Sequence, residues 1–331
     1  MRIGVIGAGS WGTTLANLLA GKGFGVALWA YEAELVSAMA VKRENDLYLP
    51  GIPLSQNIIP TASLAEAAGN RDILFLVTPS HAIRQTVREI AAHSPARAML
   101  VIASKGIENR TLLTMSAVVR DELALADGQR LAVLSGPTFA LEVSRKIPSA
   151  VTLASENQPL ARDIQQILST SFFRVYTNAD VTGVELGGAL KNVIAIAAGI
   201  SDGLLFGYNT RAALITRGLA EISRLALKMG AARDTLSGLS GLGDLVLTCT
   251  GELSRNRMVG IRLGRGEPLE EITRDMRSVA EGIRTAESAH DLSRKMEVSM
   301  PITEQVCNIL RGIKNPKDAV MELMARDLKD E

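Results

Sequence analysis

The segment Gly7-Ala8-Gly9-Ser10-Trp11-Gly12 follows the short apolar run Ile3–Ile6 and opens a helical pattern over Gly12–Ala20. Its GxGxxG spacing, after a strand and before a helix, is typical of a dinucleotide-binding turn. There the glycines allow a tight bend and a close approach of the backbone to a pyrophosphate. The amides and the positive dipole end of the helix favour an anion at the same place. We therefore predict that Gly7, Gly9 and Gly12 form part of a dinucleotide site.

Working outward from this turn, apolar runs alternate with helical patterns through the first half of the chain, which indicates βαβ units. The strand-like runs are near-continuously apolar, which predicts a parallel sheet covered on both faces. The predicted strands are Ile3–Ile6, Val26–Trp29, Ile73–Val77, Met99–Ala103 and Leu131–Leu134, with Ala150–Ala154 and Phe173–Tyr176 extending the sheet. The predicted helices between them are Gly12–Ala20, His81–Ala92, Leu112–Leu125 and Leu160–Leu168.

After about Asn178 the pattern becomes helical throughout. The candidate helices are Val181–Gly199, Arg211–Lys228, Thr285–Lys295, Ile302–Arg311 and Pro316–Leu328. We predict an α/β protein in which residues 1–178 form a Rossmann-type parallel-sheet domain that binds a dinucleotide. Residues 179–331 are expected to form an all-helical substrate-binding and catalytic domain.

Composition narrows the class of protein. The chain has 331 residues, 47% hydrophobic and 21% charged, so it is long enough for two globular domains and unlike a disordered protein. A net charge of +1 provides no strong field to attract nucleic acid or an acidic membrane. The two cysteines lie far apart, the start lacks an export signal, and no apolar run approaches the roughly 18 residues that span a bilayer. We expect a soluble cytoplasmic protein with no nucleic-acid partner and no membrane insertion.

No metal site is expected. The three histidines, His81, His93 and His290, lack the i,i+4 spacing of a zinc-binding helix, and no cysteine pair accompanies them.

The end of the second predicted strand bears on the choice of cofactor. An acidic residue there accepts the ribose 2′-hydroxyl of NAD, whereas a basic residue accepts the 2′-phosphate of NADP. The stretch reads Trp29-Ala30-Tyr31-Glu32, without arginine or lysine. This favours NADH if Glu32 takes that role; alternatively, Glu32 is a solvated residue of the next helix.

Two further segments follow predicted strands at their carboxyl ends, which is where ligands bind in open parallel sheets. In Ser104-Lys105-Gly106, the lysine either holds a substrate phosphate, bridges to the cofactor, or lies solvated in a loop. Ser135-Gly136-Pro137-Thr138-Phe139-Ala140 offers amides and the Thr138 hydroxyl as anion ligands, or is a proline turn.

Lys191 is the most informative residue. It lies in the segment Glu185–Ile196, where nearly every neighbour is apolar or small, so the helix is predicted to be buried. Lysine is rarely buried without a partner, and burial lowers the pKa of an ammonium group towards neutrality. Such a lysine suits proton exchange with a substrate oxygen. The alternative is a lysine whose stem reaches along the helix to the surface.

Two polar segments lie further along the chain. Asp244, in Gly241-Leu242-Gly243-Asp244, is expected to accept from a substrate hydroxyl or to orient Lys191. In Ser254-Arg255-Asn256-Arg257, Ser254 is expected to cap a helix whose first turn presents Arg255 and Asn256 to an anion. The alternative for the second segment is a solvated helix start.

Together these motifs resemble the bacterial NAD(P)-dependent glycerol-3-phosphate dehydrogenases over the chain from its N-terminus to about Arg311. The resemblance rests on GAGSWGTTLA at Gly7–Ala16, SKGIE at Ser104–Glu108, SGPTFALEV at Ser135–Val143, GGALKNVIAIAAGISDGL at Gly187–Leu204, NTRAALITRGLAEI at Asn209–Ile222, GLGDLVLTCTGELSRNR at Gly241–Arg257 and VAEG at Val279–Gly282.

The resemblance implies an oxidoreductase that interconverts dihydroxyacetone phosphate and sn-glycerol 3-phosphate with NAD or NADP, feeds glycerophospholipid synthesis and forms a homodimer through its helical half. Lys191 would be the proton donor and acceptor. The residues implied to bind the substrate are Lys105, Gly136, Thr138, Lys191, Asp244, Ser254, Arg255 and Asn256. Those implied to contact the cofactor are Ser10, Trp11, Tyr31, Tyr48, Lys105, Ala140, Arg255, Val279 and Glu281.

One position departs from the family. Tyr31 stands where many relatives carry arginine or histidine, so the family's usual preference for NADPH does not carry over directly. A related 3-hydroxy acid dehydrogenase and a dinucleotide sensor without turnover are the alternative functions. The first has no need of a phosphate grip at Ser254–Asn256, and the second has no use for a lysine in an apolar helix.

Overall fold

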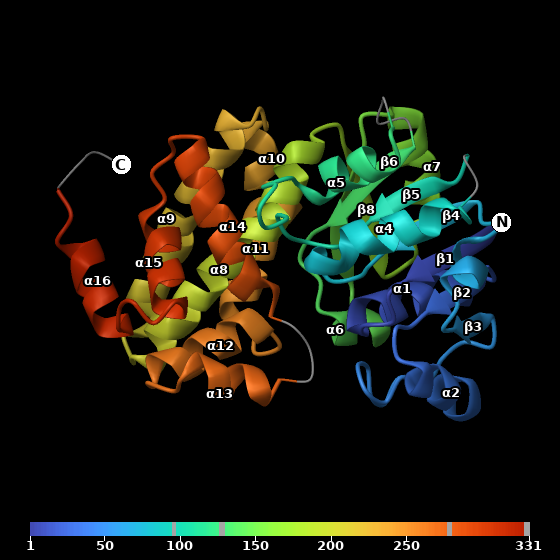
Figure 1. The fold of residues 1–331 in the computed structure, drawn as a ribbon, viewed down its shortest axis with the longest axis horizontal. Helices are drawn as coiled ribbons and strands as arrows, with labels where there is room; N and C mark the ends of the chain where they lie inside the picture. Colours follow the sequence, from blue (N-terminus) through green and yellow to red (C-terminus); the bar gives the residue numbers. More distant parts are fainter. Residues whose placement is uncertain (95–96, 126–129, 277–279, 328–331) are drawn as a thin grey trace. The chain divides into compact units, whose positions relative to one another are not determined.

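The computed structural model describes residues 1–94, 97–125, 130–276 and 280–327. The chain divides into two compact units (Figure 1). Unit 1 comprises Met1–Lys105 and Leu113–Glu185, and unit 2 comprises Gly106–Leu112 and Leu186–Glu331. Unit 1 is an α/β structure and the described part of unit 2 is helical, which confirms the predicted fold class.

Among the described residues, unit 1 is built on an eight-stranded sheet with the order β3-β2-β1-β4-β5-β6-β7-β8. Neighbouring strands run parallel, as predicted, except β6 and β7, which are antiparallel. The strands are β1 (Arg2–Ile6), β2 (Gly25–Trp29), β3 (Ile58–Thr61), β4 (Ile73–Leu76), β5 (Met99–Ile102), β6 (Leu131–Ser135), β7 (Ser149–Ala154) and β8 (Phe173–Asn178).

β3 is the strand that the sequence did not predict. It contains Pro60, which has no amide proton to donate to a neighbouring strand and therefore argues against a strand in the middle of a sheet. β3 lies at the edge and pairs only with β2, and at an edge a proline is tolerated.

Helices cover both faces of the sheet, as predicted. Successive side chains of a strand point to opposite faces. Accordingly, Ile3 and Val5 pack in a core cluster with α1, α2, α6 and α7, whereas Ile6 packs in another with α3, α4 and α5. The helices of unit 1 are α1 (Ser10–Gly21), α2 (Ala33–Lys42), α3 (Leu64–Ala68), the 3-10 turn η1 (Ser80–Ala82), α4 (Ile83–Ala91), α5 (Met115–Glu122), α6 (Ala140–Ser144) and α7 (Gln158–Leu168).

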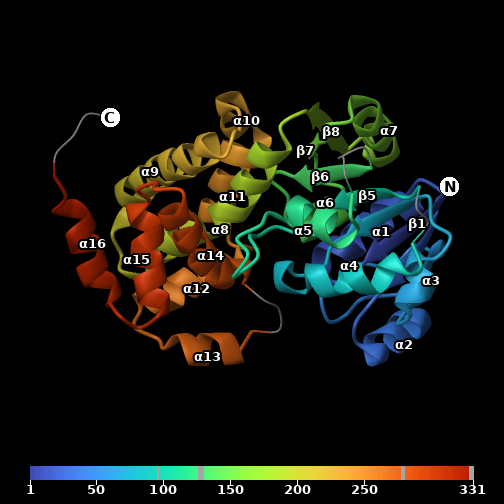
Figure 2. The ribbon, with the colours of Figure 1, turned by 45° about the horizontal axis from the view of Figure 1, so that its top comes forward.

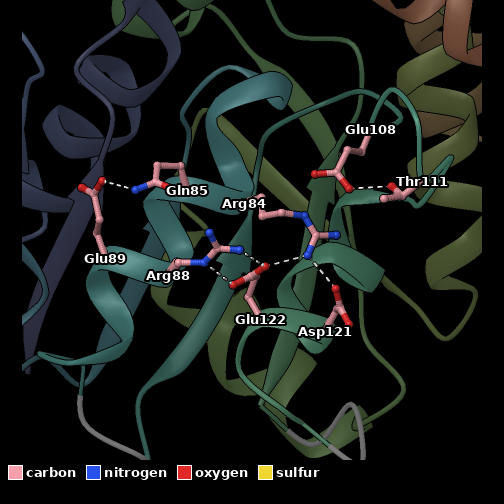
Figure 3. A network of polar contacts seen from close by, with 8 residues as sticks. All are labelled: Arg84, Gln85, Arg88, Glu89, Glu108, Thr111, Asp121 and Glu122. Atoms are coloured by element: carbon pink, nitrogen blue, oxygen red, sulfur yellow. Dashed lines mark hydrogen bonds and ion pairs between the residues drawn. The ribbon is translucent and has the colours of Figure 1, made fainter.

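Two of these helices, α4 and α5, lie side by side on one face of the sheet (Figure 2) and are joined by ion pairs (Figure 3). Arg84 of α4 donates to Asp121 and to Glu122 of α5, each at 2.6 Å. Arg88 donates to both carboxylate oxygens of Glu122, at 2.9 and 3.0 Å. The hydrogen bond from Arg88, followed by that from Arg84, lowers the pKa of Glu122. These ion pairs join α4 to α5 at the surface of unit 1.

Unit 2 is organised around α8 (Val181–Gly203), which α9, α11, α12 and α14 surround (Figures 1 and 2). Among the described residues, α8 is the helix long and apolar enough to cross a membrane, yet every residue of its apolar window is buried inside the structure. It is therefore a core helix. The other elements are α9 (Gly207–Lys228), α10 (Arg233–Ser237), the π-helical turn η2 (Leu239–Gly243), α11 (Asp244–Thr250), α12 (Arg255–Gly264), α13 (Leu269–Arg274), α14 (Glu281–Lys295), α15 (Pro301–Leu310) and α16 (Pro316–Met324).

The division between the units falls inside α8, between Glu185 and Leu186, whereas the sequence placed it after Asn178. The first turns of α8 belong to unit 1, because Val184 packs with α5 and the buried Glu185 carboxylate accepts from the Ser116 amide of α5 at 2.7 Å. A second difference from the predicted boundary concerns the short segment Gly106–Leu112, before α5. This segment belongs to unit 2, because Ile107 packs in the core of that unit. Helical periodicity cannot reveal which core each turn of a continuous helix enters.

Glycines allow α12 to approach α8 very closely. A Cβ built on Gly260 of α12 would lie 2.1 Å from the Ile196 carbonyl oxygen and 2.9 Å from the Cα of Gly199 on α8. One turn further along, Gly203 of α8 and Gly264 of α12 meet in the same way. Because backbone lies against backbone here, no side chain can yield to accommodate an added methyl group.

We predict that Gly260→Ala lowers the free energy of unfolding by about 1–3 kcal/mol, the usual cost of overpacking a core. Urea unfolding followed by circular dichroism measures this. Gly21→Ala, in α1, is the matched control, because a Cβ there meets nothing within 4 Å and should leave the midpoint unchanged or raise it slightly. Equal midpoints for Gly260→Ala and the unmodified protein would contradict the close packing.

Candidate active site

The glycine turn links β1 to α1 in unit 1 and has the geometry of a dinucleotide-binding turn. Gly7 has a φ of +120°, and a Cβ there would lie 2.9 Å from the backbone of Val77. At Gly12 a Cβ would lie 1.8 Å from the Gly7 carbonyl oxygen, whereas a Cβ at Gly9 would meet nothing within 4 Å. Gly9 is the N-cap of α1, and no side chain caps the helix from that position. The turn is thus tightly packed at Gly7 and Gly12 and open at Gly9. The open side leaves room for a pyrophosphate to bind to the backbone amides at the start of α1.

The residues next to the turn occupy different environments. Ser10 is the first residue of α1. Trp11 packs partly buried against the core, with its ring centroid 6.4 Å from that of Phe173. Ala140 is the first residue of α6, and its carbonyl accepts from the Thr14 hydroxyl of α1 at 3.2 Å. These contacts place Ala140 against the helix that follows the turn.

Three residues expected at the cofactor, Tyr31, Glu32 and Tyr48, lie around the end of β2. Glu32 is the N-cap of α2, and its carboxylate accepts from the Tyr48 hydroxyl at 2.7 Å. Burial, reinforced by the hydrogen bond to Glu32, raises the pKa of Tyr48 to about 12, so its hydroxyl stays protonated and donates. Tyr31 is 84% exposed. It lies at a pocket of about 520 Å³ lined by Trp29, Tyr31, Ala62, Leu64, Ala65, Glu89 and His93.

The carboxyl ends of β5 and β6 bring three predicted residues together. Lys105 Nζ donates to the Gly136 carbonyl oxygen at 3.4 Å, and the Thr138 hydroxyl donates to the same oxygen at 3.3 Å. Gly136 has a φ of +143°, and a Cβ there would lie 2.9 Å from the Cα of Val151 on β7. The chain can make this turn against the antiparallel strand only with glycine.

Lys191 of α8 is 8% exposed and Asp244, the first residue of α11, is fully buried. The Lys191 ammonium contacts the Asp244 carboxylate and donates to the Thr248 hydroxyl at 2.9 Å. Thr248 in turn donates to the Asp244 carbonyl at 2.6 Å. Lys191 does not extend to the surface, so the alternative of a surface lysine was wrong. A buried charge requires such a partner.

The sequence before Asp244 explains how this pair forms. The π-helical turn η2 ends at Gly243, directly before Asp244. A Cβ on Gly187 of α8 would lie 2.6 Å from the Ser240 carbonyl oxygen of η2, so glycine at this position lets the turn rest on the helix. Gly187 lies one turn before Lys191 on α8, and the close approach therefore carries Asp244 to the ammonium.

The start of α12 forms the second polar cluster of unit 2. Ser254 caps the helix, as predicted, by accepting from the Arg257 amide at 3.2 Å. Asn256 donates to Asn192 of α8 at 2.9 Å and accepts from the Gly282 amide of α14 at 2.9 Å.

Arg255, in the first turn of the same helix, is exposed over part of its side chain. Neighbouring residues bury its guanidinium, and this burial lowers the pKa of Arg255, whereas the Glu281 carboxylate acts in the opposite direction. Arginine nevertheless keeps its positive charge at neutral pH. Val279 lies outside the described residues.

Three polar residues that contact the glycine turn or the two polar clusters of unit 2 were not singled out from the sequence. Thr248 follows Asp244 by four residues on one helix, and the i,i+4 spacing could have indicated a shared face. Asn192 adjoins Lys191, but only the fold shows that it faces Asn256. Asn45 hydrogen-bonds the glycine turn from 37 residues away and carries no local signal.

Other reactive side chains do not form a further centre. Within the described ranges, no three His, Cys, Asp or Glu residues are grouped so that they could hold a metal ion. Cys249 lies close to Lys191, yet burial raises the pKa of its thiol to about 12, so it is not a thiolate at neutral pH.

Comparison with known proteins identifies the family. Residues 2–161 match the model of the N-terminus of NAD-dependent glycerol-3-phosphate dehydrogenase, and residues 180–321 match that of its C-terminus. Glycerol-3-phosphate dehydrogenase (NAD(P)+) of Geobacter sulfurreducens is 58% identical, with 100% of this chain and 98% of that protein covered. The same enzyme of Syntrophotalea carbinolica is 55% identical over 100% of this chain and 99% of that protein. A crystal structure of glycerol-3-phosphate dehydrogenase from Coxiella burnetii, 41% identical, superposes with a TM-score of 0.94 over 98% of this chain and 99% of that one. This chain therefore belongs to the NAD-dependent glycerol-3-phosphate dehydrogenase family.

Proposed function

We propose that this protein reduces dihydroxyacetone phosphate to sn-glycerol 3-phosphate, and catalyses the reverse reaction, by hydride transfer with NAD(P)H. The observation that carries the proposal is the buried Lys191 ammonium, held by Asp244 and Thr248, in a chain that also has an open dinucleotide turn. Membership of the family supports the substrate. We further propose that the enzyme acts in the cytoplasm, as a homodimer formed through unit 2, and supplies glycerophospholipid synthesis.

Unit 1 provides the groups that fit the cofactor. Gly7, Gly9 and Gly12 shape the turn, and the first amides of α1, at Ser10 and Trp11, would face the pyrophosphate. Glu32, held by Tyr48, would accept the ribose 2′-hydroxyl, with the adenine ring in the nearby pocket. When bound, NAD(P)H supplies a hydride for the carbonyl carbon of the substrate.

Lys191 would donate the proton that the substrate oxygen needs as the carbonyl becomes an alkoxide, and would accept it in the reverse direction. Asp244 and Thr248 hold the ammonium by two contacts, which orients it before the substrate arrives. Burial of all three groups limits the reorientation of water during the step, so a fixed charge stabilises the developing oxyanion more than it would in solution.

A few local cations and amides would hold the substrate phosphate, because the net charge of the whole protein is only +1. Arg255 and Asn256 lie in the first turn of α12, where helix amides and the dipole also favour an anion. Lys105 and Thr138, around the Gly136 carbonyl, are the further candidates for contact with substrate or cofactor.

Loss of the absorbance of the reduced nicotinamide tests the reaction class. We expect turnover with dihydroxyacetone phosphate and none with a 3-oxo acid. Turnover with the 3-oxo acid alone would favour a related 3-hydroxy acid dehydrogenase, and binding of NADH without turnover of either compound would favour a sensor.

We predict that Lys191→Ala lowers kcat about 100- to 10,000-fold, the usual contribution of a positioned acid. Steady-state kinetics with saturating cofactor and substrate measure the change. Lys228→Ala, at the exposed end of α9, is the control and should leave kcat unaltered. A correctly folded Lys191→Ala protein with a normal kcat would remove Lys191 from the mechanism.

Arg255→Ala should raise KM for dihydroxyacetone phosphate about 10- to 100-fold, because one charge-assisted hydrogen bond to phosphate is lost. Arg265→Ala, at the other end of the same helix, is the matched control, because Arg265 is also an exposed arginine. If both variants have the same KM as the unmodified enzyme, the phosphate binds elsewhere.

For the cofactor, we predict a kcat/KM for NADH at least about 10-fold above that for NADPH, because the Glu32 carboxylate accepts a hydroxyl but repels a phosphate. Glu32→Ala should narrow this ratio, whereas Glu34→Ala, in the exposed first turn of the same helix, should not. A preference for NADPH that Glu32→Ala leaves intact would exclude this role of Glu32.

A further inference from the structure

Asn45 is a fully buried residue at the start of the loop that joins α2 to β3. Its Nδ2 donates to the Ala8 carbonyl oxygen and to the Thr13 hydroxyl, both at 2.8 Å. Its Oδ1 accepts from the Tyr48 amide at 3.0 Å. Both amide protons and the amide oxygen are therefore used, and an exchanged orientation of the amide would lose these contacts.

The contact with Ala8 acts on the middle of the glycine turn, because Ala8 lies between Gly7 and Gly9. In a trans peptide the C=O of one residue and the N–H of the next point in opposite directions. Holding the Ala8 carbonyl on Asn45 therefore directs the Gly9 N–H away from Asn45. The Thr13 hydroxyl, which accepts from Asn45, donates to the same carbonyl at 3.2 Å and strengthens the arrangement.

The contact with Tyr48 extends the effect to the end of β2. Asn45 accepts from the Tyr48 amide, and the hydroxyl of the same tyrosine donates to Glu32. One buried amide group thus joins the turn that would face the pyrophosphate to the acid that would face the ribose.

We propose that Asn45 is a positioning residue for the dinucleotide, which sets the direction of the amides in the glycine turn and ties it to the Tyr48–Glu32 pair. The inference rests on the dinucleotide binding proposed above and assigns a role to a residue that does not touch the reacting atoms.

The loop provides a matched control in Asn17 of α1. Its Nδ2 donates to the Pro53 carbonyl at 3.0 Å and its Oδ1 accepts from the Ser55 amide at 2.9 Å. Asn17 therefore anchors the far end of the same loop with the same chemistry, but these hydrogen bonds go to Pro53 and Ser55 and not to Gly7–Gly12. Loss of loop anchoring alone would affect both asparagine variants equally.

The test is fluorescence titration of the full-length protein with NADH and with NADPH. Asn45→Ala should raise the Kd of the preferred cofactor about 10- to 100-fold, because its hydrogen bonds to the Ala8 carbonyl and to the Thr13 hydroxyl are lost. It should leave kcat and the KM for dihydroxyacetone phosphate, at saturating cofactor, close to those of the unmodified enzyme. Asn17→Ala should change Kd by less than about 2-fold, even if it lowers Tm slightly.

Thr13→Val keeps the shape of the side chain and removes the hydroxyl between Asn45 and Ala8, so it tests the same contact if Asn45→Ala does not fold. It should raise Kd about 3- to 10-fold. A folded Asn45→Ala or Thr13→Val protein with an unaltered Kd overturns the inference, as does an equal rise in Kd for Asn17→Ala. If the unmodified protein binds neither cofactor, the proposed function itself fails.

Discussion

Lys191 carries a positive charge into the apolar interior of unit 2, and Asp244 is the buried carboxylate that compensates for it. Removal of two charges from water is costly, so such a pair persists only when geometry and further hydrogen bonds are good. Thr248 supplies the hydrogen bonds, and Gly187 lets the turn before Asp244 rest on α8. The lysine on which the proposed proton transfer depends is thus held in place by the requirement that its charge be paired.

The same helix organises the residues proposed to bind the substrate. Where α12 crosses α8, Gly199 and Gly203 of α8 face Gly260 and Gly264 of α12, and these glycines bring the two backbones into contact. At that separation Asn256 reaches Asn192, and the Gly282 amide of α14 reaches Asn256. The close packing therefore aligns the first turns of α12 and α14, where Arg255 and Glu281 lie. The proposed substrate binding therefore depends on the same glycines as the stability of unit 2, because a methyl group that separated the helices would also displace these turns.

In unit 1, tight backbone geometry again needs support from outside the motif. The glycines permit the turn between β1 and α1, but their freedom does not select one direction for each amide. Asn45, Thr13 and the packing of Gly7 and Gly12 make that selection. At the end of β2, Tyr48 fixes Glu32 in the same manner. The glycine turn can bind an anion, and Asn45 and Tyr48, from the loop between α2 and β3, fix the geometry of the turn and of Glu32.

The sequence by itself determined the features that depend on neighbours in the chain: the glycine turn, the strands with continuous apolar runs, the helical second half, the cap at Ser254 and the burial of Lys191. Periodicity and turn chemistry report such features because their cause lies within a few residues. Only the tertiary structure decided that β7 runs antiparallel to β6, that β3 is an edge strand, and that the first turns of α8 belong to unit 1. Of the two roles that the sequence left open for Asp244, the tertiary structure shows the contact with Lys191, 53 residues away, and it adds Thr248 as a second partner. It also decided that Asn45 holds Ala8. These contacts join residues remote in the chain, and they form because buried polar groups must find partners wherever the packing of the core places them.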